Sequence, residues 1–407
     1  MNAATRLPLE GLRVVELGRL IAAPWAAQML ADFGAEVIKV EDPRGGDPMR
    51  NTGPGFLRDG AGQPTQDGGK FSALNRNKRS ITANIADPQG RDIVYSLLSQ
   101  ADVVIENFKV DDLARRGLDY ERVRLQNAGV VYLSITGFGQ TGPARGVGAI
   151  DPMIQAFSGF MSVNGEEGGP PLKSNVNIMD FTTGMFGAFA VLLALYERRE
   201  TGRGRYIDLS MLDCGVSMMS YTMLASLASG RQLPRLGSSN FDWVPSGVFA
   251  CADGLIYLAI GSDKDFASFC SVIGLPALAK DARYAQRAAR NAEVEMLRGL
   301  TEQSLAGGSV ERWVRDFHAA GLIAAPIHDF ADIAQDAQVQ ARGLVKMRPH
   351  AAGAEIPLVR NPIRLSGLEE LPLNAPPLLG QHTQEVLRER LGITASQIEA
   401  LARSGAI

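Results

Sequence analysis

The feature that most constrains the fold is a strand–helix–strand pattern that occurs twice before residue 109. Residues 11–17 and 35–41 are rich in β-branched residues and enclose a helix-forming segment, 23–34. A second cycle places strands at 79–85 and 102–108 around a helix at 87–101, with Asp87 as its expected cap. Residues 130–139 form a further strand that runs into a Gly-rich turn. Repeated units of this kind predict an α/β fold with a Rossmann-like parallel sheet.

The rest of the 407 residues suggests a second, smaller unit. From about residue 230 the pattern changes, and 247–261 predicts a hairpin around an Asp-Gly turn. Residues 230–335 are therefore expected to form a small α+β domain, followed by Pro-rich segments and a final helix within 336–407. Residues 42–70 are rich in Gly, Pro and Asp, which predicts a long loop.

Composition excludes several classes of protein. A net charge of −3 argues against a nucleic-acid-binding protein, which needs a basic face. The three cysteines form no C-x-x-C, and the four histidines and the cysteines have no zinc-ligand spacing, so no metal is expected. The N-terminus lacks the apolar core of a signal peptide, and no run approaches a membrane span. We therefore expect a cytoplasmic protein with no membrane partner.

Two motifs have both a structural and a functional interpretation. Gly137–Gly142 reads G-x-G-x-x-G after a strand, but Pro143 and a loop follow instead of a helix, which argues against dinucleotide binding. The turn either brings backbone amides near a ligand or is purely structural. The basic runs 75–79 and 115–116 are either solvated charge clusters or anchors for phosphate.

Asp180 stands at the start of the strongest predicted helical segment, 179–200, whose body is apolar on all sides and is expected to be buried. The structural interpretation makes Asp180 an ordinary N-cap. The functional one makes it a nucleophile, held ionised by the amides at the helix N-terminus.

The chain resembles the family III CoA-transferases over essentially its whole length. The blocks that carry the resemblance are, in order, LEGLRVVELGRLIAAPWAAQMLADFGAEVIKVEDP, NRNKRSITANI, ADVVIENF, VVYLSITGFGQTGP, IDPMIQAFSGFMSVNG, TGRGRYIDLSMLD, NPIRLSG and PLLGQHTQEVL. The family includes formyl-CoA transferase and carnitine CoA-transferase, with the related alpha-methylacyl-CoA racemase.

The resemblance assigns roles to particular residues. Asp180, in IMDFTTG, stands at the position of the family's covalent aspartate nucleophile. The resemblance also implies that the N-terminal sheet holds CoA, through Ile21, Ala22, Asp42, Ala83, Asn84, Ile85, Asn107, Phe108, Lys109, Arg115, Ile150 and Asp151.

Some positions depart from the family pattern. Asp42 stands where an arginine is common near the adenine, and Ile21 stands where formyl-CoA transferase has a glutamine. No glycine-rich flap is found near 240–262, so oxalate or formate chemistry is not expected. Ile150 occupies the position of the racemase histidine and cannot move a proton.

The family fold implies an interlocked homodimer. It also implies that residues 1–229 and 336–407 together form the large domain and 230–335 the small one. The leading hypothesis is a CoA-transferase acting through Asp180, with no metal or redox cofactor. The alternatives are a racemase or epimerase on the same scaffold and a non-catalytic acyl-CoA-binding protein. Asn164, Asn175 and Asn177 suggest small organic acids, such as the dicarboxylates succinate or mesaconate, as substrates.

Overall fold

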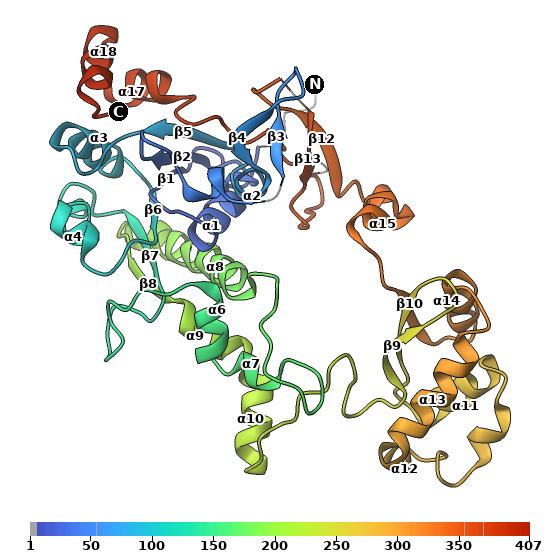
Figure 1. Cartoon of the computed structure of the whole chain (residues 1–407). Helices are drawn as coiled ribbons and strands as arrows, with labels where there is room; N and C mark the ends of the chain where they lie inside the picture. Colours follow the sequence, from blue (N-terminus) through green and yellow to red (C-terminus); the bar gives the residue numbers. More distant parts are fainter. Residues whose placement is uncertain (1–5, 54, 354, 369) are drawn as a thin grey trace. The chain divides into compact units, whose positions relative to one another are not determined.

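The computed structural model describes residues 6–53, 55–353, 355–368 and 370–407, which divide into two compact units (Figure 1). Unit 1 combines the N-terminal part up to Gly159 with Ser174–Leu224 and Gln338–Ile407. Unit 2 contains Phe160–Lys173 and Ala225–Ala337. The segment 160–173, grouped with the large domain in the sequence analysis, thus belongs to unit 2.

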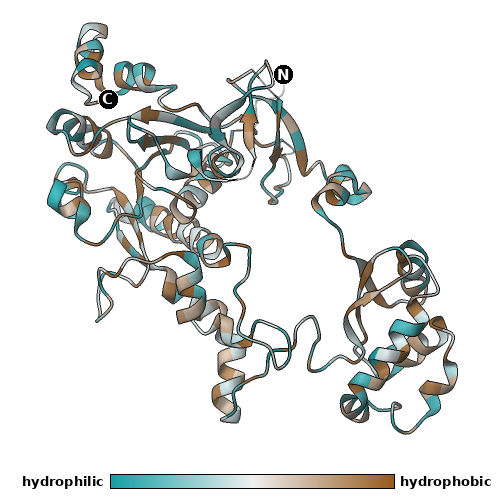
Figure 2. Ribbon diagram, in the orientation of Figure 1, coloured by the Kyte–Doolittle hydropathy of each residue, from teal (hydrophilic) through white to brown (hydrophobic). Residues whose placement is uncertain are grey.

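A six-stranded parallel sheet forms the centre of unit 1, which confirms the predicted fold class. Its strands stand in the order β5 (Lys78–Thr82), β2 (Glu36–Glu41), β1 (Arg13–Glu16), β6 (Val103–Glu106), β7 (Val131–Thr136) and β8 (Tyr206–Ser210). Registers such as Val14 opposite Val37 and Val103 make every neighbouring pair parallel. Apolar residues dominate these strands because helices cover the sheet, as the hydropathy colours in Figure 2 show.

Two predicted helices lie against this sheet. α3 (Pro88–Leu98) begins as expected, since the Asp87 carboxylate accepts hydrogen bonds from the amides of Gln89 and Gly90. α1 (Ala22–Ala31) packs against α8 (Ile178–Thr201), the long apolar helix. A Cβ at Gly184 would lie 2.7 Å from the Ala22 carbonyl oxygen, so a glycine is needed for this close approach.

The prediction that α8 is buried on all sides is only half correct. Its Gly- and Ala-rich face is buried, but Met185, Phe189, Leu193 and Tyr196 are 48%, 59%, 55% and 72% exposed. These positions follow one another at intervals of three or four residues, so they form one continuous apolar face. α8 also has the length and composition of a membrane-spanning helix, as core helices of globular proteins often do.

The C-terminal part of the chain returns to the edge of this sheet. The amide of Gly380 donates to the Ser80 hydroxyl, and the His382 amide donates to the Ser80 carbonyl. α17 (Thr383–Leu391) then packs against β5 and α3, and Figure 1 shows it beside them. The other elements of unit 1 are η1 (Pro48–Asn51), β3 (Phe56–Arg58), β4 (Pro64–Gly68), α2 (Gly69–Leu74), α4 (Asp112–Arg116), α5 (Tyr120–Val123), α6 (Asp151–Phe157), α9 (Met211–Met218), β12 (Val345–Pro349), β13 (Glu355–Val359) and α18 (Ala395–Ser404).

Unit 2 has its own core around a three-stranded sheet of order β11-β10-β9. β9 (Ser246–Ala250) and β10 (Leu255–Ala259) pair antiparallel around Asp253-Gly254, which confirms the predicted hairpin. The remaining elements are α7 (Phe160–Val163), α11 (Asp263–Val272), η2 (Pro276–Lys280), α12 (Arg287–Arg290), η3 (Asn291–Glu293), α13 (Val294–Leu305), α14 (Val310–Ala319), β11 (Ile323–Pro326) and α15 (Phe330–Gln335), while α10 (Ser220–Ser229) and α16 (Ala337–Ala341) cross the division between the units.

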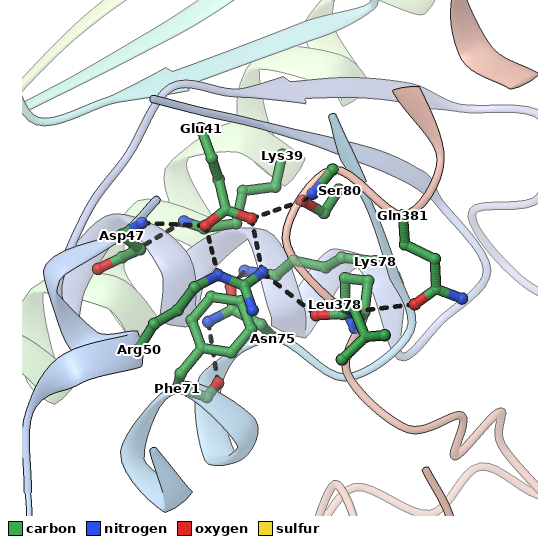
Figure 3. A network of polar contacts seen from close by, with 12 residues as sticks. Lys39, Glu41, Asp47, Arg50, Phe71, Asn75, Lys78, Ser80, Leu378 and Gln381 are labelled. Carbon is green, nitrogen blue, oxygen red and sulfur yellow. Dashed lines mark hydrogen bonds and ion pairs between the residues drawn. The ribbon is translucent and has the colours of Figure 1, made fainter. Parts of the chain in front are cut away.

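The segment 42–70 is more structured than the predicted loop, since it contains η1 and the antiparallel pair β3–β4. Its anchor is Arg50, whose side chain is 3% exposed. The guanidinium donates to Asp67 at 2.5 Å and to both carboxylate oxygens of Glu41 (Figure 3), at 2.8 and 2.7 Å. It also stacks 3.6 Å from the centre of the Phe71 ring. Polar contacts hold this segment, which is why hydrophobic periodicity did not reveal it.

Arg50→Met is expected to lower the free energy of unfolding by about 3–5 kcal/mol, because it leaves the buried carboxylates of Glu41 and Asp67 without their cation. Urea denaturation measures this loss. Arg44→Met is the matched control, since Arg44 pairs with Asp42 in the same segment but its side chain is 78% exposed. Its loss should leave the free energy of unfolding nearly unchanged, because water already screens this exposed pair. Equal effects of the two substitutions would contradict the anchoring role of Arg50.

Candidate active site

A cavity of about 450 Å³ lies in unit 1 at the carboxyl ends of β1, β6 and β7. Ligands bind in this position in open parallel sheets, because the loops that leave neighbouring strands diverge there. The residues that line it come from the segments after β1, β6 and β7, from the 42–70 segment and from the starts of α8 and α9; they are Leu20–Ala22, Met49, Thr52, Lys70, Asn107–Val110, Ile135–Gly137, Gly146–Pro152, Asn177, Asp180 and Met211.

Asp180 lies on the wall of this cavity, as the nucleophile hypothesis requires. It is not the N-cap, contrary to the expectation from sequence. α8 begins at Ile178, so Asn177 is the cap residue and Asp180 belongs to the first helical turn. The first amides of this helix, those of Met179 and Asp180, donate to another carboxylate instead of that of Asp180.

Asp151 performs the capping that was assigned to Asp180. Its Oδ2 accepts hydrogen bonds from the amides of Met179, at 2.8 Å, and Asp180, at 3.1 Å. Its Oδ1 accepts from Nε2 of Gln155 at 2.5 Å. Gln155 is in turn oriented by the Ser174 amide, which donates to its Oε1 at 2.8 Å. Asp151 is only 2% exposed, so a second, firmly held carboxylate lies beside Asp180.

The pKa of Asp180 is raised to about 7. Burial is the largest cause, the nearby charge of Asp151 is the second, and a hydrogen bond from Asn177 opposes both. The expectation that the helix N-terminus keeps Asp180 ionised is thus wrong in direction. The amides that would have stabilised its anion are bonded to Asp151 instead.

The turn Gly137–Gly142 offers fewer free backbone amides to a ligand than its sequence suggested. The Gly139 amide donates to Oγ1 of Thr136 at 2.9 Å, and the Gln140 amide donates to Oδ2 of Asp208 at 3.1 Å. Both amides therefore already donate hydrogen bonds within the protein and are not available to stabilise an oxyanion. Among residues 137–142, all within the described chain, Gly137 is the one that lines the cavity.

A second hollow shares Phe108 with the first, so the two are neighbours. It is lined by three of the predicted CoA contacts, Asp42, Ala83 and Ile85, together with Gly18 and Arg19. Ile21, Ala22, Asn107, Lys109, Ile150 and Asp151 line the larger cavity. The smaller hollow has a volume of about 30 Å³, so the larger cavity, which Asp180 lines, provides most of the space for a ligand.

Two predicted CoA contacts are not brought to these cavities. Arg115 is bound to Asp112, and its side chain is 64% exposed. The Asn84 side chain accepts from the Ala86 amide, within its own loop. Neither residue is among those that line the two spaces.

The basic run 75–79 is neither a solvated cluster nor a phosphate anchor. Arg76 is buried and forms an ion pair with Asp32. Lys78 is buried beside Glu16, and Arg79 binds Glu36 and two glutamates of α17. Each of these three side chains thus pairs with carboxylates of the protein itself.

Sequence reasoning missed three polar residues of the site. Arg19 lies in the smaller hollow, where its guanidinium is 4.8 Å from the centre of the Phe108 ring. Lys70 and Thr52 reach the larger cavity from the 42–70 segment. The position of Arg19 directly after β1 was a usable signal. The Gly-rich context of Lys70 and Thr52 gave none.

Among the residues that the structure describes, no group of three or more His, Cys, Asp or Glu side chains is placed to hold a metal ion. The three cysteines are free. Independence from metals and redox cofactors stays a prediction.

A parallel α/β sheet with a cavity at its strand ends is common to many classes of enzyme, so the fold alone does not define the reaction. Comparison with known proteins shows which family of enzymes the chain belongs to. A family model described as CoA-transferase family III matches residues 9–383, and the chain belongs to this family. It is therefore a CoA-transferase.

Named relatives and a solved structure agree with this assignment. The chain is 42% identical to succinate–glutarate CoA-transferase of Agrobacterium fabrum, over 94% of this chain and 95% of the relative. It is 34% identical to succinyl-CoA:mesaconate CoA-transferase of Haloarcula marismortui, over 94% and 96%. The crystal structure of a CaiB/BaiF family protein from Brucella suis superposes with a TM-score of 0.87 at 38% identity, covering 95% of this chain and 100% of that one.

Asp180→Asn is expected to stabilise the protein, and the gain should grow with pH. The folded-state pKa of Asp180, about 7, lies above its unfolded value, so the native state holds a proton that the unfolded state has released between these values. Wild-type stability is therefore lost as pH rises through this window, while the Asn variant has no proton to lose. The variant should gain about 1–3 kcal/mol more at about pH 8 than at about pH 4.

Urea denaturation of both proteins at the two pH values measures this difference. Asp213→Asn is a matched control, because Asp213 lies exposed in the first turn of α9 and outside the cavity. A pH-independent difference between wild type and Asp180→Asn would contradict the raised pKa.

Proposed function

We propose that this enzyme transfers CoA between carboxylic acids through covalent intermediates on Asp180. The observation that carries the proposal is the position of the Asp180 carboxylate. Asp180 is partly buried on the wall of a cavity of about 450 Å³, beside Asn177, which also lines the cavity and is hydrogen-bonded to the Asp180 carboxylate. A desolvated carboxylate next to a thioester carbonyl is a suitable nucleophile.

The transfer then proceeds in four balanced steps. A carboxylate oxygen of Asp180 attacks the donor thioester carbonyl, and the C–S bond breaks to give a mixed anhydride and CoA thiolate. The thiolate attacks the Asp180 carbonyl carbon, which releases the donor acid and leaves an aspartyl-CoA thioester. The acceptor carboxylate attacks this thioester and displaces the thiolate again. The thiolate finally attacks the acceptor's acyl carbon, which yields the product thioester and restores Asp180.

We further propose that the acids are small dicarboxylates. The relatives' printed names support this class, since they pair succinate with glutarate and succinyl-CoA with mesaconate. Of the three asparagines that suggested polar acids, Asn177 lines the cavity, while Asn164 belongs to unit 2.

Incubation with an acyl-CoA donor followed by hydroxylamine is expected to modify Asp180, because both the anhydride and the aspartyl thioester react with this nucleophile. Peptide mass spectrometry identifies the modified residue. The yield should rise as pH increases through about 7, since the ionised form of Asp180 is the attacking species. Asp180→Asn should lose nearly all transfer activity, and about 3–4 kcal/mol or more of transition-state stabilisation corresponds to such a loss.

Asp213→Asn again serves as the control and should retain both the adduct and the activity. An Asp180→Asn enzyme that transfers CoA at the wild-type rate would refute the assignment. Tight binding of acyl-CoA by the wild type without any adduct or transfer would favour the alternative of a binding protein.

Racemisation on this scaffold is not expected. Exchange at the alpha carbon needs an acid and a base on opposite sides of it. Ile150 lines the cavity at the position of the racemase histidine, and none of the four histidines, all in the described chain, lines it. Incubation of a 2-methylacyl-CoA in deuterated water should leave its alpha carbon free of deuterium. Incorporation at the catalytic rate would revive this alternative.

We propose that a second copy of the chain covers the exposed face of α8. This face is apolar over several turns, and its residues Met185, Phe189, Leu193 and Tyr196 are too exposed for a stable isolated chain. The opposite face is already occupied by α1. The dimer implied by the family resemblance provides a partner of matching character.

Sedimentation across a dilution series is expected to show a species of twice 43.6 kDa and no folded monomer. Leu193→Glu should disrupt this species, because it places a charge in the apolar contact. A stable monomer that retains activity on dilution would refute the proposal.

A further inference from the structure

Two lysines line the large cavity, and they differ in their surroundings. Lys109 follows β6 and also lines a third hollow, which contains Asp111 and Asp119. Lys70 lies in the first turn of α2 and reaches the cavity together with Met49 and Thr52. Of the two, Lys70 belongs to the segment whose role the sequence did not explain.

α2 is packed directly against the part of the fold that carries Asp180. Phe71 and Leu74 of α2 form a small apolar cluster with Ile21 and Met49, and Phe181 and Trp25 pack against it. Phe181 follows Asp180 in the chain, and its ring meets Trp25 edge-on with the ring centres 5.2 Å apart. Lys70 and Asp180 therefore line the same cavity, and the residues that follow them, Phe71 and Phe181, belong to one apolar cluster.

The support of Lys70 is rigid. Arg50 stacks on Phe71, the residue next to Lys70, and binds Glu41 (Figure 3). It also binds Asp67. Asp67 lies three positions before Lys70. A side chain placed on so fixed a base is suited to recognising one point of a ligand.

Lys70 also has an unused charge. The lysines of the sheet, Lys39 and Lys78, are buried and bound to carboxylates. Within the described residues, Lys70 forms no ion pair with any protein carboxylate. A cation that faces a ligand cavity without a protein counter-ion is suited to an anionic ligand group.

We propose that Lys70 binds the carboxylate at the far end of the acyl group and so selects dicarboxylic over monocarboxylic acids. This inference rests on the proposed function. The thioester carbonyl of the bound acyl-CoA is held at Asp180, and the chain of a four- or five-carbon diacid extends from there along the wall formed by α2. A monocarboxylate of equal length places a methyl group at the ammonium and leaves the charge unpaired.

An internal competition tests the proposal. Equal concentrations of succinate and butyrate compete for the same aspartyl-CoA form of the enzyme, made from one acyl-CoA donor, and mass spectrometry gives the ratio of succinyl-CoA to butyryl-CoA. This ratio does not depend on the amount of folded enzyme or on the donor step. The wild type should favour succinate. Lys70→Met should reduce the ratio about 10- to 100-fold, the effect of losing one charge-assisted hydrogen bond.

Two further variants complete the experiment. Lys70→Arg keeps the charge and should retain most of the preference. Lys264→Met removes an exposed lysine from α11 in unit 2 and should leave the ratio unchanged.

The inference is overturned if the wild type shows no preference for succinate, or if Lys70→Met keeps the wild-type ratio. It is equally overturned if Lys109→Met removes the preference and Lys70→Met does not. Hydroxylamine trapping at Asp180 separates the two levels of the proposal. An unchanged ratio in a Lys70→Met enzyme that still forms the adduct refutes the role of Lys70 alone. A wild type that forms no adduct refutes the proposed function, and the Lys70 assignment with it.

Discussion

A cluster of buried charges beneath the strand ends of β1, β2 and β5 supports the remainder of the site. Glu16 accepts hydrogen bonds from Lys39 at 2.8 Å and from Lys78 at 2.7 Å, and none of the three side chains is exposed. Burial alone would lower the pKa of Lys39, but Glu16 and the neighbouring carboxylates raise it. Burial lowers the pKa of Lys78 to about 8, against the attraction of Glu16. Such a cluster is stable only when each charge has its partners.

This cluster extends to the residues that shape the cavity. Asp47 pairs with Lys39 at 2.9 Å and accepts a hydrogen bond from the Leu20 amide. Leu20 has a φ of 65°, a left-handed conformation that a leucine adopts only when its surroundings impose it. The same turn carries Ile21 and Ala22 into the cavity wall. The polar interior of the sheet thus determines the path of the loop that a substrate would meet.

The parts of the fold that were predictable from sequence are those with a strong local signal. The β-α-β repeats, the Asp87 cap and the Asp-Gly hairpin each depend on neighbouring residues, and all three are present as expected. The structure of 42–70 was not predictable, because Arg50 meets Glu41 and Asp67 across a Gly-rich segment with no periodic pattern. The same reason applies to the run 75–79, whose charges look solvated until their distant partners are known.

Asp180 itself shows the limit of local reasoning. Its place before an apolar helix suggested a cap, but the cap is supplied by Asp151, 29 residues earlier in the chain. Nothing in the local sequence separates an aspartate that bonds the helix amides from one that leaves them to another carboxylate. The difference reverses the direction of the pKa shift, and with it the chemical character of the residue.

The raised pKa has a consequence for the energetics of the proposed reaction. The charge of free Asp180 lies in a partly buried position beside Asp151, where it costs about 1–3 kcal/mol more than the same charge in water. In the mixed anhydride and in the aspartyl-CoA thioester, Asp180 is uncharged, and this repulsion is absent. The negative charge is then on the CoA thiolate or on the released acid, both of which can move away from Asp151. The second carboxylate therefore destabilises the resting enzyme relative to its covalent intermediates, which reduces the energy needed to form an otherwise strained anhydride.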